Sequence, residues 1–401
     1  DAHVHLRDPG RVEREDFETG TRAAAAGGVT TILEMPISLP PVYTADILRA
    51  RQEGVAAKAV VDYAFYGAAG ADNLEEIPRL AAEGVVGFKT FLHSPPPGRE
   101  KEFVGLCAVG SGVLREILRC VATTGKVSAV HVEDDSIVQW EINRLKALGR
   151  NDGPAHAESR PEIAEIAATA QVLALARDAG VRVHLAHMSS PVAVEMARQA
   201  RRSGVRVTVE TCPQYLLLTE EELARQGPFA KINPPMRSEA SREGMWRLLL
   251  EGAIDLVASD HSPFLLEEKE RGFQDIWMAP AGSPGLETLL PLMLTEVANG
   301  RLTLSHLVRL VSENPARIFG LYPRKGAVRV GSDADLVVVD MQAETTIRRE
   351  RMYTKARDSA RLYEGRRVQG LPVLVAVRGN VVMRDGEVVG RPGWGQFVRP
   401  E

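Results

Sequence analysis

Short apolar runs rich in β-branched residues alternate with longer Ala- and Leu-rich segments along most of the chain. In the longer segments, apolar residues recur at the three- and four-residue spacing of an amphipathic helix. We therefore predict that strands and helices alternate. The predicted strands are residues 3–6, 29–35, 59–66, 85–91, 127–132, 181–187, 205–211 and 255–259, and the predicted helices include residues 17–26, 162–179, 191–202 and 242–251.

This alternation predicts the fold class. Strands that are joined by crossover helices run parallel. The strand segments are apolar throughout rather than at every second position, which is typical of a sheet buried on both faces. Eight such units close most economically into an α/β fold of the (β/α)8 TIM-barrel type. A doubly wound open sheet is the alternative, and it explains the polar residues described below less well.

The pattern changes after Gly326. Residues 331–340 predict a turn and a strand, and residues 371–384 predict a hairpin around Arg378-Gly379-Asn380. We expect residues 1–325 to form the barrel and residues 326–401 to form the C-terminal part of a small β-sandwich. The chain opens without Met, directly on a candidate ligand motif, so we expect a preceding N-terminal segment that supplies the rest of the sandwich.

The charge of the chain is almost balanced, with 49 basic and 53 acidic residues. This balance gives no indication of a nucleic-acid or membrane surface, and no apolar run approaches the roughly 20 residues of a membrane span. The three cysteines, Cys107, Cys120 and Cys212, are scattered and form no CxxC pair. They favour a reducing, cytoplasmic environment over a disulfide framework or a thiolate zinc site.

Polar side chains stand where several predicted strands end. In a barrel of this type the carboxyl ends of the strands form one rim, and active sites lie there. His3 and His5 are two residues apart and so share one face of a strand, and neutral imidazole is a common zinc ligand. The other rim residues are Lys89, His131, His187, Asp260 and His261. Together they predict a metal site.

Lys89 lies inside the otherwise apolar residues 85–91. Burial lowers the pKa of a lysine, which leaves a neutral amine that can add carbon dioxide. The resulting carbamate is a carboxylate-like group able to bridge two metal ions. His184 stands three residues before His187, so we expect it on the opposite face of its strand as a packing residue.

Five motifs, in order along the chain, resemble those of the amidohydrolase superfamily. More narrowly, they resemble its branch of dihydroorotases, allantoinases and dihydropyrimidinases (hydantoinases). The motifs are His3-x-His5, Gly87-Phe88-Lys89, His131-Val132-Glu133, His187-Met188-Ser189-Ser190 and Ser259-Asp260-His261-Ser262-Pro263. The fold that the resemblance implies is a barrel with a small β-sandwich, in agreement with the pattern above.

In that family the site holds two zinc ions bridged by a carboxylated lysine and a hydroxide. The resemblance implies the following ligands: His3, His5 and Asp260 for the more buried zinc ion, His131 and His187 for the second, and Lys89 as the bridge. It also implies that Asp260 is the catalytic residue, taking the proton of the hydroxide and returning it to the leaving amide nitrogen. His261 is expected to orient the ligands rather than to bind metal.

The residues on the substrate side have mixed resemblances. Arg7, in Leu6-Arg7-Asp8-Pro9-Gly10, is dihydroorotase-like and could hold a substrate carboxylate. Ile37 and Phe264 stand where a dihydroorotase is expected to have an asparagine and a histidine. Residues 18–25 and 210–213 are more similar to allantoinases, although Gln214 replaces their usual histidine. Asn233, Ser283 and Gly285 are expected to line the substrate.

We therefore predict a dinuclear metal-dependent hydrolase that opens a cyclic amide or ureide at a C–N bond other than a peptide bond, with allantoin as the leading substrate. The alternatives are dihydroorotase activity, hydantoinase (dihydropyrimidinase) activity, and an amidohydrolase of other specificity such as a lactonase. A catalytically inactive assembly partner is the non-enzyme alternative, but such relatives usually lose metal ligands, and none is lost here. Relatives are often dimers or tetramers, so a homodimer or homotetramer is expected.

Overall fold

The computed structural model describes all 401 residues, and at its centre lies a sheet of seven parallel strands in the order β1 to β7. At least one helix joins each strand to the next. The strands are β1 (Thr31–Glu34), β2 (Asp62–Ala68), β3 (Gly87–Phe91), β4 (Val127–His131), β5 (Arg182–Leu185), β6 (Val207–Thr211) and β7 (Leu256–Val257).

The segment around Val4 closes this sheet into a barrel. Val4 forms parallel bridges with Glu34 of β1 on one side and with His261, just beyond β7, on the other. The N–H of His5 donates to the carbonyl of His261 at 2.9 Å, and the N–H of Met35 donates to the carbonyl of Val4 at 2.8 Å. The predicted TIM-type barrel is therefore confirmed, with residues 3–6 in the place of its first strand.

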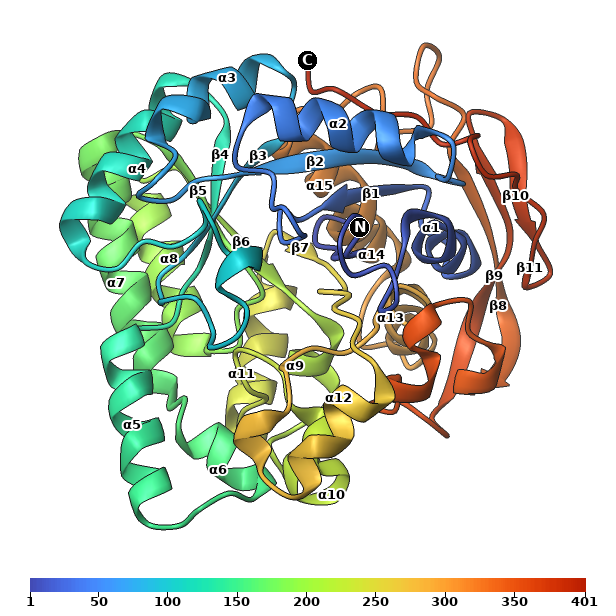
Figure 1. Ribbon diagram of the computed structural model, residues 1–401. Coiled ribbons are helices and arrows are strands. Elements are labelled where there is room, and N and C mark those ends of the chain that lie inside the picture. Colours follow the sequence, from blue (N-terminus) through green and yellow to red (C-terminus); the bar gives the residue numbers. More distant parts are fainter.

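Helices surround the barrel, with α4, α7 and α8 side by side along one flank (Figure 1). Their amphipathic faces explain this placement: in α4, the buried residues are Leu114, Ile117, Leu118 and Val121, spaced three or four apart. The helices are α1 (Phe17–Ala26), α2 (Ala45–Ala56), α3 (Ile77–Ala82), α4 (Ser111–Thr123), α5 (Asp135–Ala147), α6 (Gly153–Glu158), α7 (Glu162–Ala179), α8 (Pro191–Arg202), α9 (Pro213–Leu217), α10 (Glu221–Gln226), α11 (Glu239–Leu250), α12 (Leu266–Glu270), α13 (Leu289–Ala298), α14 (Leu304–Val308) and α15 (Asn314–Ile318).

A cluster of apolar side chains that is separate from the main core fills the inside of the barrel. It includes Ala2, Tyr66 of β2, Ala129 of β4 and Phe319, which follows α15. The hydroxyl of Tyr66 donates to the carbonyl of Ala2 at 3.0 Å, and its ring packs edge-on against Phe319. The barrel is thus packed rather than open, and polar residues at its carboxyl-terminal rim stand on a closed floor.

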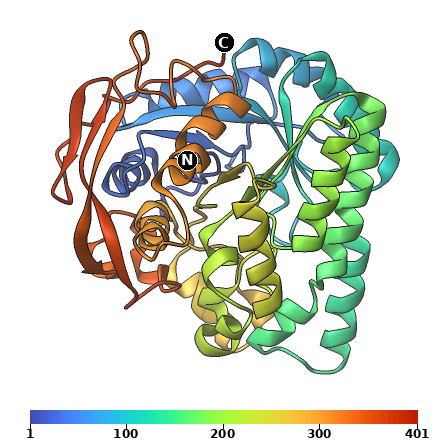
Figure 2. The same ribbon diagram turned by 180° about the vertical axis from the view of Figure 1, so that it is seen from behind.

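A second, antiparallel sheet lies at one side of the barrel. Its strands are β8 (Leu336–Thr346), β9 (Arg367–Val377), β10 (Asn380–Arg384) and β11 (Glu387–Val388), in the order β11-β10-β9-β8. Seen from behind, it stands beside α1 and α13 at the edge of the molecule (Figure 2). The predicted hairpin is present, but its first strand begins at Arg367, earlier than the predicted residue 371.

Most predicted strands are shorter in the structure, for example Thr31–Glu34 in place of residues 29–35, and after two of them the chain turns sharply. The predicted strand over residues 181–187 ends at Leu185, and the one over residues 255–259 is reduced to Leu256–Val257. His187 has a φ of 40° and Asp260 a φ of 49°, in the left-handed region that no strand residue adopts. No helix of this fold combines the length and the apolar character that crossing a membrane requires.

Candidate metal centre and substrate cavity

The barrel rim brings the six predicted metal-binding side chains together. His3 and His5 flank the strand position of Val4, Lys89 lies within β3, and the remaining three are His131 at the end of β4, His187 after β5 and Asp260 after β7. A cavity of about 920 Å³ opens over the rim, and all of these residues except Lys89 line it. Lys89 lies beneath and is fully buried.

His3, His5 and Asp260 form a compact group. Nε2 of His3 and Nε2 of His5 lie 3.4 and 3.5 Å from the same oxygen, Oδ1 of Asp260. One nitrogen or oxygen atom from each of the three residues lies within 4.8 Å of the others, close enough to share one metal ion. Burial raises the pKa of Asp260, whereas the neighbouring His3 and Lys89 lower it, and the balance is a raised value.

Glu210 of β6 orients His3, and the sequence reasoning assigned it no role. Nδ1 of His3 lies 2.7 Å from Oε1 of Glu210. Because a carboxylate only accepts, Nδ1 carries the proton, and the lone pair on Nε2 faces Asp260. Burial would raise the pKa of Glu210, but His3 and His184 hold it well below its ordinary value. The available signal was a single acid in the apolar run at residues 205–211.

His131 and His187 form a second group beside the first. Nδ1 of His131 lies 3.1 Å from Nε2 of His187. Nε2 of His131 donates to Oε2 of Glu133 at 2.7 Å, so its Nδ1 carries a lone pair directed at His187. Burial lowers the pKa of His131 to about 4 and that of His187 well below its usual value. Both imidazoles are therefore neutral near pH 7, as metal ligands must be.

Lys89 has no hydrogen-bond partner for its Nζ, although the side chain is completely buried. An unpaired buried ammonium is costly, and burial lowers the pKa of Lys89 to about 8. Nζ also lies 4.9 Å from the centre of the Phe91 ring, which flanks it on β3. A neutral amine at this position is the form that the predicted carbamate chemistry requires.

The donor set is suited to divalent metal ions. Imidazole nitrogens and a carboxylate are zinc ligands, and the lone pairs of His3 and His131 are directed inward by Glu210 and Glu133. Nζ of Lys89 and the Nδ1 atoms of His5 and His187 have no hydrogen-bond partner within the protein. The ring centres of His3 and His187 lie 5.1 Å apart, so the two groups are contiguous.

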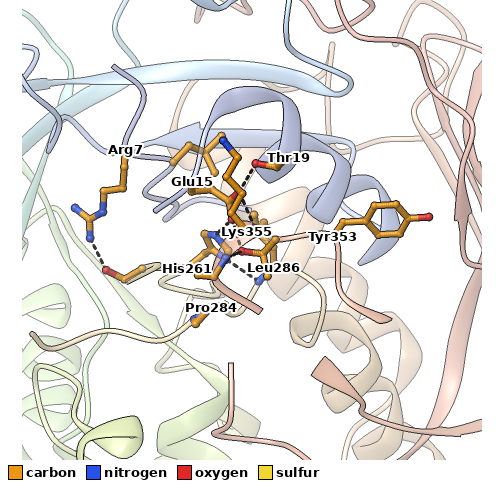
Figure 3. A network of polar contacts seen from close by, with 12 residues as sticks. Arg7, Glu15, Thr19, His261, Pro284, Leu286, Tyr353 and Lys355 are labelled. Atoms are coloured by element: carbon orange, nitrogen blue, oxygen red, sulfur yellow. Dashed lines mark hydrogen bonds and ion pairs between the residues drawn. The ribbon is translucent and has the colours of Figure 1, made fainter. Parts of the chain in front are cut away.

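Arg7 lines the cavity with most of its guanidinium unpaired. Its Nη2 donates to Oγ of Ser262 at 2.7 Å, whereas Nε and Nη1 have no partner. Figure 3 shows Arg7 on one side of a polar network, with Tyr353 on the other. The guanidiniums of Arg7, Arg14 and Arg99 lie over the ring of Phe264, with each central carbon 4.9 to 5.5 Å from the ring centre.

The other predicted substrate-side residues occupy two places. Asn233 and Ile37 line the large cavity, and Oδ1 of Asn233 is buried without a partner. Ser283 and Gly285 line a smaller hollow beside Asp260. The N–H of Gly285 already donates to Nδ1 of His261 at 3.2 Å. The contact of these residues with a substrate stays a prediction.

One histidine points differently from what residue spacing indicates. His184, expected on the opposite face, turns into the barrel, where its Nε2 lies 3.3 Å from Oε2 of Glu210 and its ring packs on Phe319. The reason is the left-handed φ at His187, which breaks the alternation of faces along the strand.

His261 turns away from the neighbouring Asp260, toward α1 and the 283–286 loop. Its Nδ1 accepts from the N–H groups of Gly285 and Leu286, and its Nε2 lies 3.5 Å from Oε2 of Glu15 (Figure 3). His261 therefore holds the loop that follows Ser283.

The chain is similar to known cyclic-amide hydrolases over its whole length. The sequence model of the Amidohydrolase family matches residues 1–387. An L-hydantoinase of Paenarthrobacter aurescens is 40% identical over 400 residues, covering 99% of this chain and 86% of that protein. An allantoinase of Deinococcus radiodurans is 37% identical, covering 100% of this chain and 87% of the relative.

A solved structure, described as an L-hydantoinase (dihydropyrimidinase) from Arthrobacter aurescens, superposes on this fold with a TM-score of 0.95 at 40% identity. The match covers 100% of this chain and 87% of that chain.

Proposed function

The chain belongs to the amidohydrolase family, and from this premise we propose that it is a metal-dependent hydrolase that opens the ring of hydantoin-type cyclic ureides. Its relatives are named as hydantoinases, allantoinases and dihydroorotases, so the family supports a hydrolase of cyclic amides without singling out allantoin. Allantoin is itself a hydantoin with a ureido group on the ring carbon. The proposed class therefore includes it.

The observation that carries the proposal is the arrangement of ligand atoms at the floor of the cavity. His3, His5 and Asp260 offer three atoms within 4.8 Å of one another, and His131 and His187 offer two more nitrogens 3.1 Å apart. Lys89, buried and unpaired, would carry the bridging carboxylate as a carbamate. We propose zinc as the metal, because imidazole and carboxylate oxygen are among its usual ligands.

Two divalent ions held by these residues would activate water and polarise the ring carbonyl. The chain's own residues handle the proton and the substrate. Asp260 accepts the proton of the attacking water and returns it to the ring nitrogen as the C–N bond breaks. Glu210 and Glu133 keep the imidazoles of His3 and His131 in the tautomers that present lone pairs to the cavity.

The side chain of Ile37 favours a substrate whose ring substituent is neutral or weakly polar. It is buried in the wall of the cavity and offers no hydrogen bond. Asn233, in the same wall, has a free Oδ1 that can accept from a ring N–H. A ureide ring has N–H donors and carbonyl acceptors, and it matches this mixture of one apolar and one accepting group.

A carboxylated ring, such as dihydroorotate, is the second candidate, and Arg7 is the observation in its favour. Two of the three nitrogens of its guanidinium are unpaired in the cavity. Burial, together with Arg99 and Arg14, lowers the pKa of Arg7 to about 9, so the group is still charged near pH 7. A substrate carboxylate would pair with it as a fork.

A hydrolysis panel with the zinc-loaded protein tests both candidates. The substrates are hydantoin, a 5-substituted L- and D-hydantoin, allantoin, dihydrouracil and dihydroorotate, with ring opening followed by loss of ultraviolet absorbance. The proposal expects hydantoins and allantoin to be opened faster than dihydroorotate. If dihydroorotate is turned over faster than every other substrate of the panel, the second candidate replaces the first. A zinc-loaded protein that opens no ring would refute both.

A further inference from the structure

Residues 276–282, here called the 276–282 loop, form one wall of the substrate cavity. Six of these residues, from Trp277 to Gly282, line the cavity together with Asn233. The end of the loop packs closely on residues beside Arg7. A Cβ on Gly282 would lie 2.8 Å from both Phe264 and Ser262, and Ser262 accepts a hydrogen bond from Arg7. The position of this loop therefore sets how much space lies beside the ring.

The backbone of this loop pairs with itself only in part. Ile276–Met278 form one short 3-10 turn, in which the N–H of Ala279 donates to the carbonyl of Ile276 at 3.3 Å, whereas Pro280 and the following Pro284 have no N–H. On its outer side, the N–H of Ile276 donates to the carbonyl of Asn151, and the indole of Trp277 donates to the carbonyl of Arg150. The inward-facing carbonyls need other donors, because buried carbonyls are nearly always paired.

Lys231 supplies two of these donors. Its Nζ donates to the carbonyls of Ile276 at 2.7 Å and Ala279 at 2.6 Å. The residue is 7% exposed. Burial lowers the pKa of Lys231 to about 7, and a neutral amine still has the two N–H groups that these two bonds use.

Lys269 of α12 supplies donors to two more carbonyls of the loop. Its Nζ donates to the carbonyls of Gly282 at 2.9 Å, Pro280 at 3.1 Å and Lys231 at 3.2 Å. It is 1% exposed. The N–H of Gly282 also donates to the carbonyl of Lys231 at 2.9 Å. The two lysines and the loop thus form one connected set of hydrogen bonds.

Neither lysine has a carboxylate within ion-pair distance, although both are buried. Across the chain, the other buried lysine outside the metal centre, Lys325, has Asp62, Asp333 and Asp335 around it. A buried amine held only by main-chain carbonyls is expensive to desolvate. Neither Lys231 nor Lys269 therefore contributes an ion pair to the stability of the fold. Their hydrogen bonds hold the backbone of the 276–282 loop in place.

We propose that Lys231 and Lys269 are positioning residues that fix the 276–282 loop and thereby determine which ring substituents the cavity accepts. The inference rests on the proposed ring-opening function for its consequence in catalysis. All side-chain hydrogen bonds of the two lysines go to main-chain carbonyls and none to a metal-binding residue, although Lys231 itself lines the cavity. Their loss should alter selection among substituents much more than the turnover of an unsubstituted ring.

The catalytic test compares Lys231→Met and Lys269→Met with the wild type. For a 5-benzyl or 5-ureido hydantoin, KM is expected to rise about tenfold, because the loop wall beside the ring substituent is no longer held in one position. For unsubstituted hydantoin, kcat/KM is expected to stay within about threefold. Lys126→Met is the matched control, because Lys126 is a half-buried lysine at the start of β4, at the other end of the barrel. It should leave both substrates unchanged.

Hydrogen–deuterium exchange of the zinc-loaded proteins tests the loop without any substrate. Amides of residues 276–282 should exchange about tenfold faster in both variants than in the wild type, with the α7 amides unchanged. Unchanged loop exchange, or an equal loss of activity on both hydantoins, would overturn the inference. Where Lys269→Met does not fold, Lys231→Met and Lys231→Gln carry the comparison. A wild type that opens no ring would refute the proposed function, whereas the exchange data would still decide on the loop.

Discussion

Nδ1 of His3 and Oε1 of Glu210 lie 2.7 Å apart, and both side chains are at most 1% exposed. The same Oε1 accepts the backbone N–H of His187 at 2.9 Å. The carboxylate of Glu210 therefore orients the imidazole of His3 in the first ligand group. It also holds the turn of the chain at His187, which belongs to the second group. Neutral imidazole binds metal through one nitrogen, and the partner of the other nitrogen fixes which one it is.

Replacing Glu210 by glutamine should weaken metal binding by about 10- to 100-fold, the usual effect of removing a carboxylate partner from a ligating histidine. The dissociation constant is measured by competition with a chromophoric chelator. Glu251→Gln, an exposed partner of Arg198 on the outer surface, is the control and should bind metal like the wild type. Equal affinity in Glu210→Gln would mean that Glu210 only packs.

Replacing Lys89 by methionine should move activity and stability in opposite directions. Ring opening is expected to fall on the order of a thousandfold, because several kcal/mol of metal-derived stabilisation would be lost. The melting temperature of the metal-free protein should hold or rise, because a buried amine without a partner is removed. The two measurements are steady-state rates and calorimetry. Full activity in Lys89→Met would exclude Lys89 as the bridge.

Replacing Arg7 by methionine should separate the two candidate substrates. Turnover of dihydroorotate should fall about 10- to 100-fold, since a charge-assisted hydrogen bond is worth 1.5–3 kcal/mol. Hydantoin, which has no carboxylate, should be opened at close to the wild-type kcat/KM. Arg7→Lys keeps the charge without the fork and should recover only part of the loss. An equal fall for both substrates would show that Arg7 supports the cavity rather than recognising an anion.

Local sequence signals were sufficient for much of the fold. The predicted helices at residues 17–26, 162–179 and 191–202 have the same bounds in the structure. Each has a signal at one end: the side chain of Asp16 caps α1, Gly180 ends α7 with a φ of 64°, and Ser190 precedes Pro191 in α8. The convergence of His3, Lys89 and Asp260 followed from barrel topology alone.

Local sequence signals could not predict contacts between distant residues or single residues in the left-handed region. The periodicity of a strand placed His184 outside the barrel, and the φ of 40° at His187 reverses that. Nothing in the sequence near His3 indicates that its partner is Glu210, 207 residues away. Similarly, the carbonyls that hold Lys231 and Lys269 belong to a loop without any periodic pattern, so these lysines could be placed only from the structure.

Replacing Glu287 by glutamine should stabilise the protein at alkaline pH. The carboxyl of Glu287 accepts two hydrogen bonds, from the backbone N–H groups of Tyr353 at 2.9 Å and Thr354 at 3.2 Å. Burial, reinforced by nearby Glu15, raises its pKa from 4.5 to about 8 against the opposing effect of those two bonds. The folded protein then binds this proton more tightly than the unfolded chain does. Stability therefore falls as the pH rises from 4.5 to about 8 and levels off above that.

Glutamine removes this proton linkage, so the melting temperature of Glu287→Gln should match the wild type near pH 4.5 and exceed it by about 2 °C or more at pH 9. The exposed Glu387→Gln of β11 is the control and should follow the wild type at every pH. Thermal denaturation from pH 4.5 to 9 measures both. A Glu287→Gln variant that is less stable than the wild type at pH 9 would show that the carboxylate is ionised in the folded state and that its charge strengthens the bonds to Tyr353 and Thr354.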